Sequence, residues 1–478
     1  MKSRRKFLKT VAIVGTVLSS TPIYLLGAPQ NKIQLKSDII KFLAACESGD
    51  HRVVKALLLE DKSLMIAKDK LGRSGYALAL LAGHSGIGEL LKNSGYKPDI
   101  HESALGLDWD RYDELVGEES EATIKLINSN HPIGGTVMWA AAAGGAGIDI
   151  WRIYAKCGDP NAAPRKENGS TPLQRALRFS DLATAEQTSG AILSNNAEVD
   201  PANNADLPPL HIASERGSYL MVEMLIRLGA DINRKDQNGL LATQLAEKNG
   251  HMDVFKLLMN HKSIPKTCRT SRMALNADGL KYEAPDISDI PLYLRRRLVG
   301  QSHGNLDYVK KTVTADPRMA HSVATTSEIC VEACAHIGRK PIVEYLLKHG
   351  APYSLPTAVM MNDFTTVKRL LNEDPMRIEE RGAHDFGLLW YPIIGECDVD
   401  MAQLLIDRGA NVEHQHFMGT TALHWACQRN RMDMVELLVE NGADINRVGR
   451  KFKAEGQTPL QSTGNQTILK YLKSRGAV

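Results

Sequence analysis

The chain has 478 residues, a formal charge of +3, and only 5% aromatic residues. This length is enough to bury a large core or several domains, and the scarcity of large rings disfavours a β-sandwich. The positive charge comes from the first 28 residues, which carry basic but no acidic side chains, so the remainder is slightly acidic. Nucleic-acid binding needs a clustered excess of positive charge, and therefore we expect no nucleic-acid partner.

Residues 1–28 are typical of an export signal. A basic start precedes an apolar run from Val11 to Leu18, and Leu26–Ala28 offers a cleavage site. The segment Ser3–Lys9 resembles the bacterial twin-arginine motif Ser-Arg-Arg-x-Phe-Leu-Lys at every fixed position. This resemblance implies a protein that folds in the cytoplasm and is exported to the periplasm or cell envelope.

Two alternatives to cleavable twin-arginine export are a general secretory signal and an uncleaved inner-membrane anchor. The apolar run is short for a spanning helix, which needs about 20 apolar residues. We therefore expect contact with a membrane only if the signal stays uncleaved.

A repeated unit begins at about residue 36 and has a period of about 33 residues. The pentapeptide Gly229–Asn233 returns as Gly442–Asn446, and Gly409–Glu413 is a third copy. The start of the unit is Pro209–Ala213 in one copy and Thr421–Ala426 in another, with a shared Leu-His-x-Ala core. Glycine at the end of the first helix supplies a positive φ. A period of 33 with a Thr-Pro-Leu-His-x-Ala start resembles the ankyrin repeat family.

The resemblance implies an all-α fold, an ankyrin-type α-solenoid of about a dozen helix pairs with short β-hairpin fingers. We expect a partly degenerate N-terminal array over 36–262, a connector over 263–297 that matches no repeat position, and a C-terminal array over 298–478. Each unit leaves an apolar face bare, so only stacking on its neighbours stabilises it. The implied function is non-catalytic binding of another protein, as an adaptor, an inhibitor or a chaperone-like protein.

The seven cysteines are expected to be buried thiols. Cys46 and Cys427 occupy alanine positions of the repeat. Cys330 and Cys334 are four residues apart on a predicted helix, which places their Cβ atoms about 5–6 Å apart. A disulfide requires about 3.5–4.5 Å, so that bridge would be strained.

The candidate binding residues lie on finger tips and first helices, the surfaces with which ankyrin-type proteins bind partners. His414 and His416 are spaced to point the same way from a strand, and the two readings are exposed finger residues that contact a partner or a solvated turn. A metal site would need two further ligands, which the sequence does not reveal. The full set in this class is Arg234, Lys235, His414, His416, Phe417 and Trp425.

The last finger is longer than the others. Its glycines, Gly442 and Gly456, are fourteen residues apart, against ten for Gly409 and Gly419. The insertion adds an aromatic residue flanked by cations, which suits an acidic partner, although a floppy loop is the alternative. The residues added are Arg450, Lys451, Phe452 and Lys453.

No catalytic, cofactor-binding or metal-binding residue is assigned, and no cofactor is expected. The glycine-rich segments 83–86 and 144–147 lack the further residues of a nucleophile elbow or a phosphate loop. The family resemblance implies that His211 and His424 hydrogen-bond the backbone of the adjacent repeat. The alternative hypothesis is an exported enzyme whose site lies in the divergent segments 96–135 or 263–297.

Overall fold

The structure is a computed structural model of the whole chain, and we describe ten stretches of it. These are residues 30–118, 120–162, 169–195, 197–201, 207–260, 268–269, 282–324, 328–416, 419–451 and 454–478. No described helix combines the length and apolar character needed to cross a membrane.

The first half of the chain forms a row of short antiparallel helix pairs. Its helices are α2 (Gln30–Ser48), α3 (His51–Glu60), α4 (Gly75–Leu81), α5 (Ser85–Asn93), α6 (Ile100–Leu105), α7 (Trp109–Val116), α8 (Glu121–Ile127), α9 (Val137–Gly144), α10 (Trp151–Tyr154), α11 (Pro172–Leu177), α12 (Leu182–Leu193), α13 (Pro209–Arg216), α14 (Tyr219–Arg227), α15 (Ala242–Lys248) and α16 (Met252–Met259). Two 3-10 turns, η1 (Lys62–Ile66) and η2 (Gly147–Ile150), complete the described part of this first array.

The second half repeats the arrangement as a second array. Its helices are α17 (Leu292–Gln301), α18 (Leu306–Ala315), α19 (Cys330–Ala335), α20 (Lys340–Lys348), α21 (Leu355–Met360), α22 (Phe364–Glu373), α23 (Trp390–Ile394), α24 (Val399–Asp407), α25 (Ala422–Gln428), α26 (Met432–Glu440) and α27 (Gln466–Ser474). The 3-10 turns are η4 (Pro317–His321), η5 (Pro375–Glu379), η6 (Ala383–Asp385) and η7 (Leu460–Ser462).

Local sequence explains where the helices start and stop. Thr171 caps α11 by accepting the backbone N–H of Gln174 at 3.2 Å, and Pro172 occupies the first turn, where a missing N–H costs nothing. The first helix of a later pair, α13, ends at Gly217 with φ 73°. That left-handed conformation suits glycine, because it has no Cβ to clash with the next carbonyl.

The described strands are short. β1 (Cys268–Arg269) pairs in parallel with β2 (Glu380–Arg381), and β3 (Gly449–Lys451) pairs antiparallel with β4 (Ala454–Gln457). The first pair joins the segment between the arrays to a finger of the second array. Helix α17 crosses the boundary that we drew at residue 297, because the basic run ending at Arg297 continues into an apolar, buried turn at Leu298 and Val299.

Each array has its own hydrophobic interior. One cluster of buried side chains runs from Ile290 to Leu472 in the second array, and two others cover the first array up to Leu258. The cysteines with described side chains are buried within these arrays and unbridged, as the sequence predicted. The second array therefore stacks on itself rather than sharing a core with the first.

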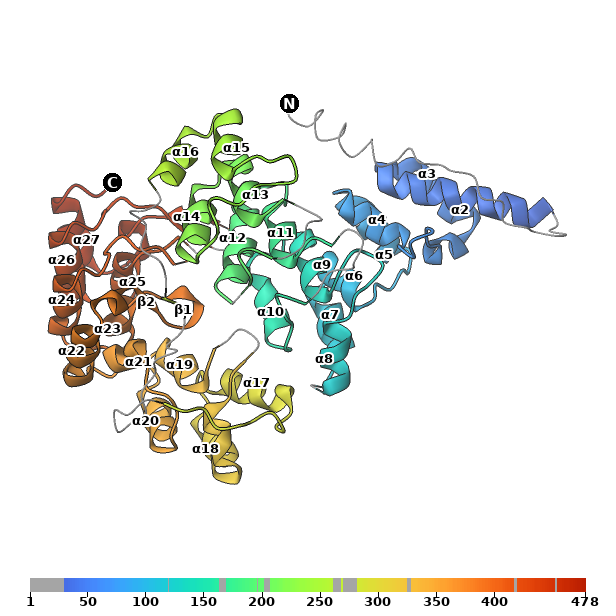
Figure 1. Cartoon of the computed structure of the whole chain (residues 1–478). Helices are drawn as coiled ribbons and strands as arrows, with labels where there is room; N and C mark the ends of the chain where they lie inside the picture. Colours follow the sequence, from blue (N-terminus) through green and yellow to red (C-terminus); the bar gives the residue numbers. More distant parts are fainter. Residues whose placement is uncertain are drawn as a thin grey trace.

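The chain turns back on itself between the arrays (Figure 1). Helices α10, α12 and α14 lie on the side of the first array that faces the second, where β2 and α25 are found. Within each pair α9/α10, α11/α12 and α13/α14, these are the second helices. The second array thus lies beside the outer helices of the first.

Candidate functional site at the junction of the two arrays

The two arrays meet through aromatic and polar side chains. Trp151 of α10 packs edge-on against His384 of η6, with ring centroids 4.3 Å apart and an interplanar angle of 87°. Arg296 of α17 donates from Nε to the carbonyl of Tyr154 at 2.9 Å. These contacts place the outer helices of the first array against the finger side of the second.

A charged side chain makes a further contact at the junction. Arg227, at the end of α14, is bound through Nη1 to Nδ1 of His414, and through Nη2 to Glu223 Oε1 at 2.8 Å. Only 7% of the Arg227 side chain is exposed. Because the arginine supplies the proton, Nδ1 of His414 is the acceptor, and the ring proton of a neutral His414 lies on Nε2.

Two fingers, one in each array, share one turn but differ in the turn residue. Asp236 accepts the backbone N–H groups of Asn238 and Leu240, both at 2.8 Å, before Gly239 turns the chain with φ 76°. In the second array His416 stands in the place of Asp236. Its backbone N–H donates to Thr420 at 2.9 Å.

An aromatic belt extends from the junction across the finger side of the second array. Phe386 is its centre, with His416 at 4.4 Å, Trp425 at 5.3 Å and Trp390 at 6.2 Å between ring centroids. Trp390 in turn packs edge-on against His414 at 5.3 Å. The belt thus links the Arg227 contact to the interior of the second array.

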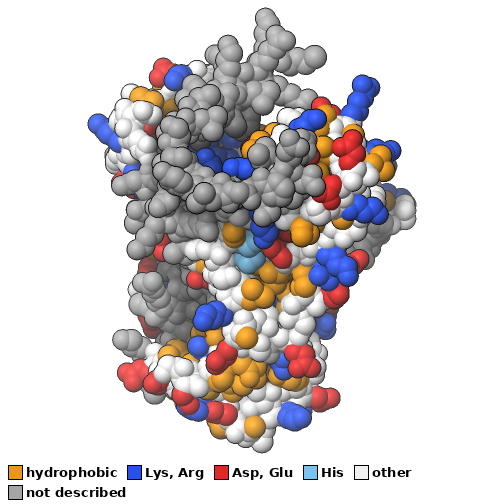
Figure 2. Space-filling view, turned by 90° about the vertical axis from the view of Figure 1, so that its right-hand side faces the viewer, with side chains coloured by type: hydrophobic (Ala, Val, Ile, Leu, Met, Phe, Trp, Pro, Cys, Tyr) orange, Lys and Arg blue, Asp and Glu red, His pale blue; other side chains and the backbone are white. Residues whose placement is uncertain are grey.

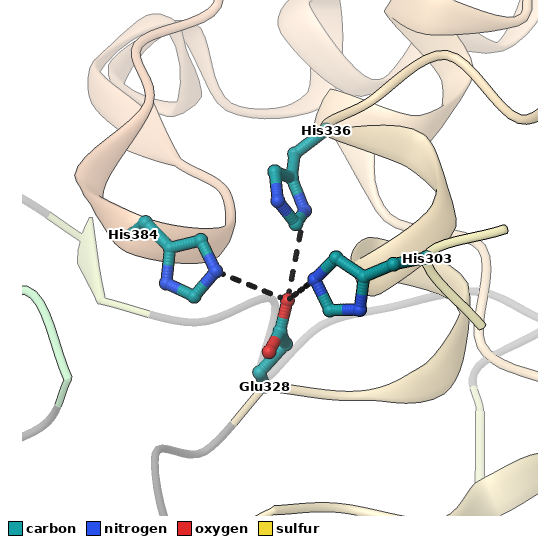
Figure 3. A group of neighbouring side chains, drawn as sticks. All are labelled: His303, Glu328, His336 and His384. Carbon is teal, nitrogen blue, oxygen red and sulfur yellow. Dashed lines mark ion pairs between the residues drawn. The ribbon is translucent and has the colours of Figure 1, made fainter. Parts of the chain in front are cut away.

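A cluster of three histidines surrounds one buried carboxylate at the edge of this belt (Figure 3). We name His303, Glu328, His336 and His384 the His–Glu cluster. Oε1 of Glu328 lies 3.5 Å from Nε2 of His303, 3.5 Å from Nδ1 of His336, and 3.3 Å from Nε2 of His384. The ligating atoms of all four side chains lie within 4.8 Å of one another.

Three different parts of the second array supply the cluster. His303 follows α17, Glu328 precedes α19, His336 caps the end of α19, and His384 comes from η6. The side chains of Glu328 and His336 are each 7% exposed, that of His384 is 11% exposed and that of His303 is 35% exposed. The site is therefore nearly closed, with His303 on its solvent side.

Hydrogen bonds fix the orientation of two of the rings. Nδ1 of His303 lies 3.2 Å from the carbonyl of Val299 and 3.1 Å from that of Gly300. Nδ1 of His336 lies 2.9 Å from the carbonyl of Glu332. A carbonyl only accepts hydrogen bonds, so the proton lies on Nδ1 in each ring, and in a neutral His303 the lone pair of Nε2 faces Glu328.

Burial and charge act in opposite directions within the cluster. Burial alone raises the pKa of the Glu328 carboxyl, but the charges of His384, His303 and His336 and a hydrogen bond with His384 outweigh it, and the pKa is lowered. For His336, burial lowers the pKa to about 3, with the neighbouring His384 contributing in the same direction. Glu328 is thus ionised and His336 neutral near pH 7.

The backbone at His384 is in an uncommon conformation. Its φ of 59° and ψ of 28° place a non-glycine residue in the left-handed region. Such conformations cost about 1–3 kcal/mol and persist where the surrounding structure holds them. Here the Trp151 ring and the cluster hold the imidazole from two sides.

Comparison with known sequences decides the family. The sequence profile described as "Ankyrin repeats (3 copies)" matches residues 137–236, 210–277, 355–449 and 393–478, together more than half of the chain. The chain belongs to the ankyrin repeat family. The prediction of an all-α ankyrin-type solenoid is confirmed.

Two curated relatives illustrate how far the similarity extends. The "B-cell lymphoma 3 protein homolog" of Mus musculus is 24% identical over 311 residues, which are 65% of this chain and 52% of that protein. The "Ankyrin repeat domain-containing protein 40" of the same species is 36% identical over 76 residues, which are 16% of this chain and 20% of the relative. The chain thus spans about half the length of the first relative and far less of the second.

Two solved ankyrin repeat domains also resemble the chain. The human ASB11 ankyrin repeat domain is 18% identical, with a TM-score of 0.25, and covers 56% of this chain and 98% of its own. The Bcl-3 ankyrin repeat domain is 19% identical, with a TM-score of 0.23, and covers 64% of this chain and all of its own. Similarity this low says nothing of how the two arrays are arranged here.

The ankyrin histidines have the predicted structural role. Nε2 of His211 lies 3.0 Å from the carbonyl of Leu240, and Nε2 of His424 lies 3.0 Å from that of Gln457. Each bond joins the start of a first helix to the next finger. His101 makes the same bond to Ser129 at 3.0 Å.

The expected exposure of His414 and His416 is wrong. His414 is 2% exposed and His416 is 1% exposed. The register is that of an exposed finger, but α14 and the aromatic belt cover this finger in the second array. Trp425 is half-buried in the same belt, and burial together with the charges of His384 and His336 lowers the pKa of His416 well below its ordinary value.

The remaining predicted binding residues do not join this group. Arg234 is half-buried and donates to the carbonyl of Pro201 at 3.1 Å, while Lys235 beside it is exposed. Arg450 and Lys451 lie in β3, but their side chains are outside the described part of the structure. Phe417, Phe452 and Lys453 also lie outside the described residues, so the proposal for the last finger stays a prediction.

A second polar group, in the divergent segment 96–135, has a structural explanation. His131 takes the place of the finger aspartate, and its Nδ1 accepts the backbone N–H of Ile133 at 3.3 Å. Its Nε2 lies 3.0 Å from Asp99, which also caps α6. The ring stacks on His101, whose own Nε2 is bound to Ser129. The side chains of Asp99, His101 and His131 thus hold adjacent repeats together.

No sequence motif marks the His–Glu cluster. Its residues stand at irregular spacings over 82 positions, and no pair has a spacing typical of metal ligands. The only available signal was the presence of histidine at positions that the repeat pattern does not explain. Only the stacking of successive repeats brings them together.

Proposed function

We propose that this ankyrin repeat protein is a non-catalytic protein-binding module that engages its partner through the finger side of the first array. Ankyrin repeats are generally protein-interaction modules. The observation that supports this assignment is the asymmetry between the arrays. The finger side of the second array is covered by α10 and α14, whereas the finger tips of the first array before α4 and before α15 carry exposed side chains.

Two finger tips of the first array illustrate the available surface. In the finger before α4, Lys70 is exposed and Leu71 is 53% exposed. This tip is held by a hydrogen bond from Asp69 N–H to the Arg73 carbonyl at 2.9 Å. In the finger before α15, Lys235 is exposed. Exposed apolar and cationic side chains on a rigid turn suit a protein surface with acidic residues at its rim.

The charge distribution favours a protein over a nucleic acid as partner. On the side of the molecule shown in Figure 2, basic and acidic side chains are interspersed, and hydrophobic side chains gather between them. Phosphate binding requires a broad surface of positive charge, which this face lacks among the described residues.

We further propose that the protein acts in the periplasm or cell envelope after export by the twin-arginine route. The proposal rests on the Ser3–Lys9 motif and the apolar run behind it. The intact mass of the native protein tests the processing step. A mass near that of residues 29–478 agrees with a cleaved signal, and a full-length mass favours the inner-membrane anchor.

Site-specific photo-crosslinking tests the binding surface in the native cell. A photoreactive amino acid is placed at Leu71 and at Lys235, on fingers, and at Lys256, which is exposed on the second helix α16. We expect the finger positions to crosslink to one partner and the Lys256 position to give none. Crosslinking from Lys256 alone, or from none of the three, would contradict the proposed surface.

A further inference from the structure

We propose that His303, Glu328, His336 and His384 bind one divalent transition-metal ion of borderline softness, with Zn²⁺ the best fit. The site is at the junction of the two arrays and goes beyond the protein-binding function proposed above. Three imidazoles and one carboxylate are a donor set that zinc accepts, whereas Mg²⁺ prefers oxygen ligands alone.

The spacing within the cluster fits a tetrahedral ion better than hydrogen bonds. A tetrahedron with metal–ligand bonds of about 2.0–2.1 Å has ligand–ligand edges of about 3.3–3.4 Å. The three distances from Glu328 Oε1 to imidazole nitrogens are 3.3, 3.5 and 3.5 Å. A charge-assisted N–H···O hydrogen bond is shorter, at about 2.7–2.9 Å. The three imidazole nitrogens are therefore already at about the distance from Glu328 Oε1 that a shared ion imposes, and all four ligand atoms lie within 4.8 Å of one another.

The orientation of the His303 ring also suits a bound cation. Nδ1 of His303 donates to the carbonyls of Val299 and Gly300, so in the neutral ring Nε2 presents a lone pair. That lone pair points toward Oε1 of Glu328, 3.5 Å away, so a metal ion between the two atoms would be bound by both. A backbone carbonyl on the distal nitrogen of a metal-bound histidine is also a common orienting contact in metal sites.

His336 must change its tautomer to bind the ion. Its Nδ1 is the atom near Glu328, and it donates to the carbonyl of Glu332 at 2.9 Å. When Nδ1 binds the metal, the proton lies on Nε2 and this hydrogen bond is lost. The carbonyl of Glu332 remains satisfied, because it also accepts the backbone N–H of His336 at 3.0 Å.

The site is of the structural kind. Four protein ligands complete a tetrahedral shell and leave no open position for a substrate, which distinguishes structural from catalytic zinc. The ion joins the turn after α17 and both ends of α19 to η6. Trp151 of the first array packs on the His384 ring, so the metal fixes the surface on which the first array rests. The left-handed backbone at His384 is then held by a coordinate bond.

Metal binding is tested on the native protein as the cell processes it. The purified protein is stripped with a chelator and titrated calorimetrically with Zn²⁺, and with Mg²⁺ as a control. We expect one equivalent of Zn²⁺ to bind and to raise the thermal midpoint, with no effect of Mg²⁺. Co²⁺ in place of Zn²⁺ should give the intense visible absorption of a four-coordinate ion.

Variants locate the site. His303→Ala changes the most exposed ligand and is expected to fold; His384→Ala removes the ligand from η6. Each should weaken Zn²⁺ binding by more than about 100-fold, the upper end of what loss of an orienting contact alone costs. The matched controls are His349→Ala, at the C-terminal end of α20, and His131→Ala, in the other histidine group, and both should retain one equivalent.

Any of three results would overturn the proposal. One is a wild-type protein that binds no stoichiometric Zn²⁺ and shows no thermal shift. Another is Zn²⁺ binding that survives in His303→Ala and His384→Ala or disappears in His131→Ala, since the ion would then lie elsewhere. A Co²⁺ spectrum of six-coordinate type would contradict the closed four-ligand geometry.

Discussion

Arg227 offers the sharpest test of how the arrays are held together. Its guanidinium binds His414 across the junction and Glu223 within α14, and its side chain is 7% exposed. A hydrogen bond from a charged donor contributes about 1.5–3 kcal/mol net. Glu223 is 30% exposed, so solvent screens the interaction between Glu223 and Arg227. Most of the stabilisation by Arg227 therefore comes from its bond to His414. We expect a coupling energy of about 1.5 kcal/mol between Arg227 and His414, which is about a tenfold change in the docking equilibrium.

A double-mutant cycle measures this coupling. The variants are Arg227→Ala, His414→Ala and the double variant, and separation of the arrays is followed in urea by small-angle scattering. The two single substitutions should destabilise the docked form, and the double variant should lose less than their sum. The control is Arg234→Ala, which removes a cation whose described contacts, Asp200 and Pro201, belong to the first array, and it should leave docking unchanged. Coupling below about 0.5 kcal/mol would refute the role of this contact.

Three further predictions concern single side chains. Tyr391 is fully buried, and its hydroxyl has no hydrogen-bond partner among the described residues, so Tyr391→Phe should leave stability unchanged or raise it by about 1 kcal/mol in thermal melts. Gly217→Ala should cost at least about 1–2 kcal/mol, because φ is 73° and the new Cβ would lie 2.3 Å from the His251 ring; a neutral melt would contradict this. Burial lowers the pKa of His211, so the unfolded chain takes up a proton below about pH 6.5 that the folded chain does not. Stability should therefore fall as the pH drops below about 6.5, and less steeply in His211→Gln.

The sequence predicted well what neighbouring repeats determine. The Leu-His-x-Ala start and the helix-ending glycine recur with the period of the repeat, and each acts within one unit or on the next. His211 reaches Leu240, 29 residues along the chain, and His424 reaches Gln457, 33 residues along. A pattern with this period therefore reveals such contacts directly.

The repeat pattern could not predict how the two arrays are arranged. Arg227 and His414 are 187 residues apart, and their meeting depends on the accumulated curvature of two stacks and on the segment between them. No periodic signal marks which finger will be covered. For the same reason, the sequence placed His414 and His416 on the surface, and it did not bring His303 and His384 together.

The separate interiors of the two arrays have a mechanical consequence. Pulling the arrays apart breaks a few polar and aromatic contacts, whereas unravelling either array exposes its buried apolar side chains to water. A force applied between the ends of the chain should therefore part the arrays before it unwinds any repeat. The contacts at the junction are therefore the first to break under load, and an ion bound beside them would raise the force needed to separate the arrays.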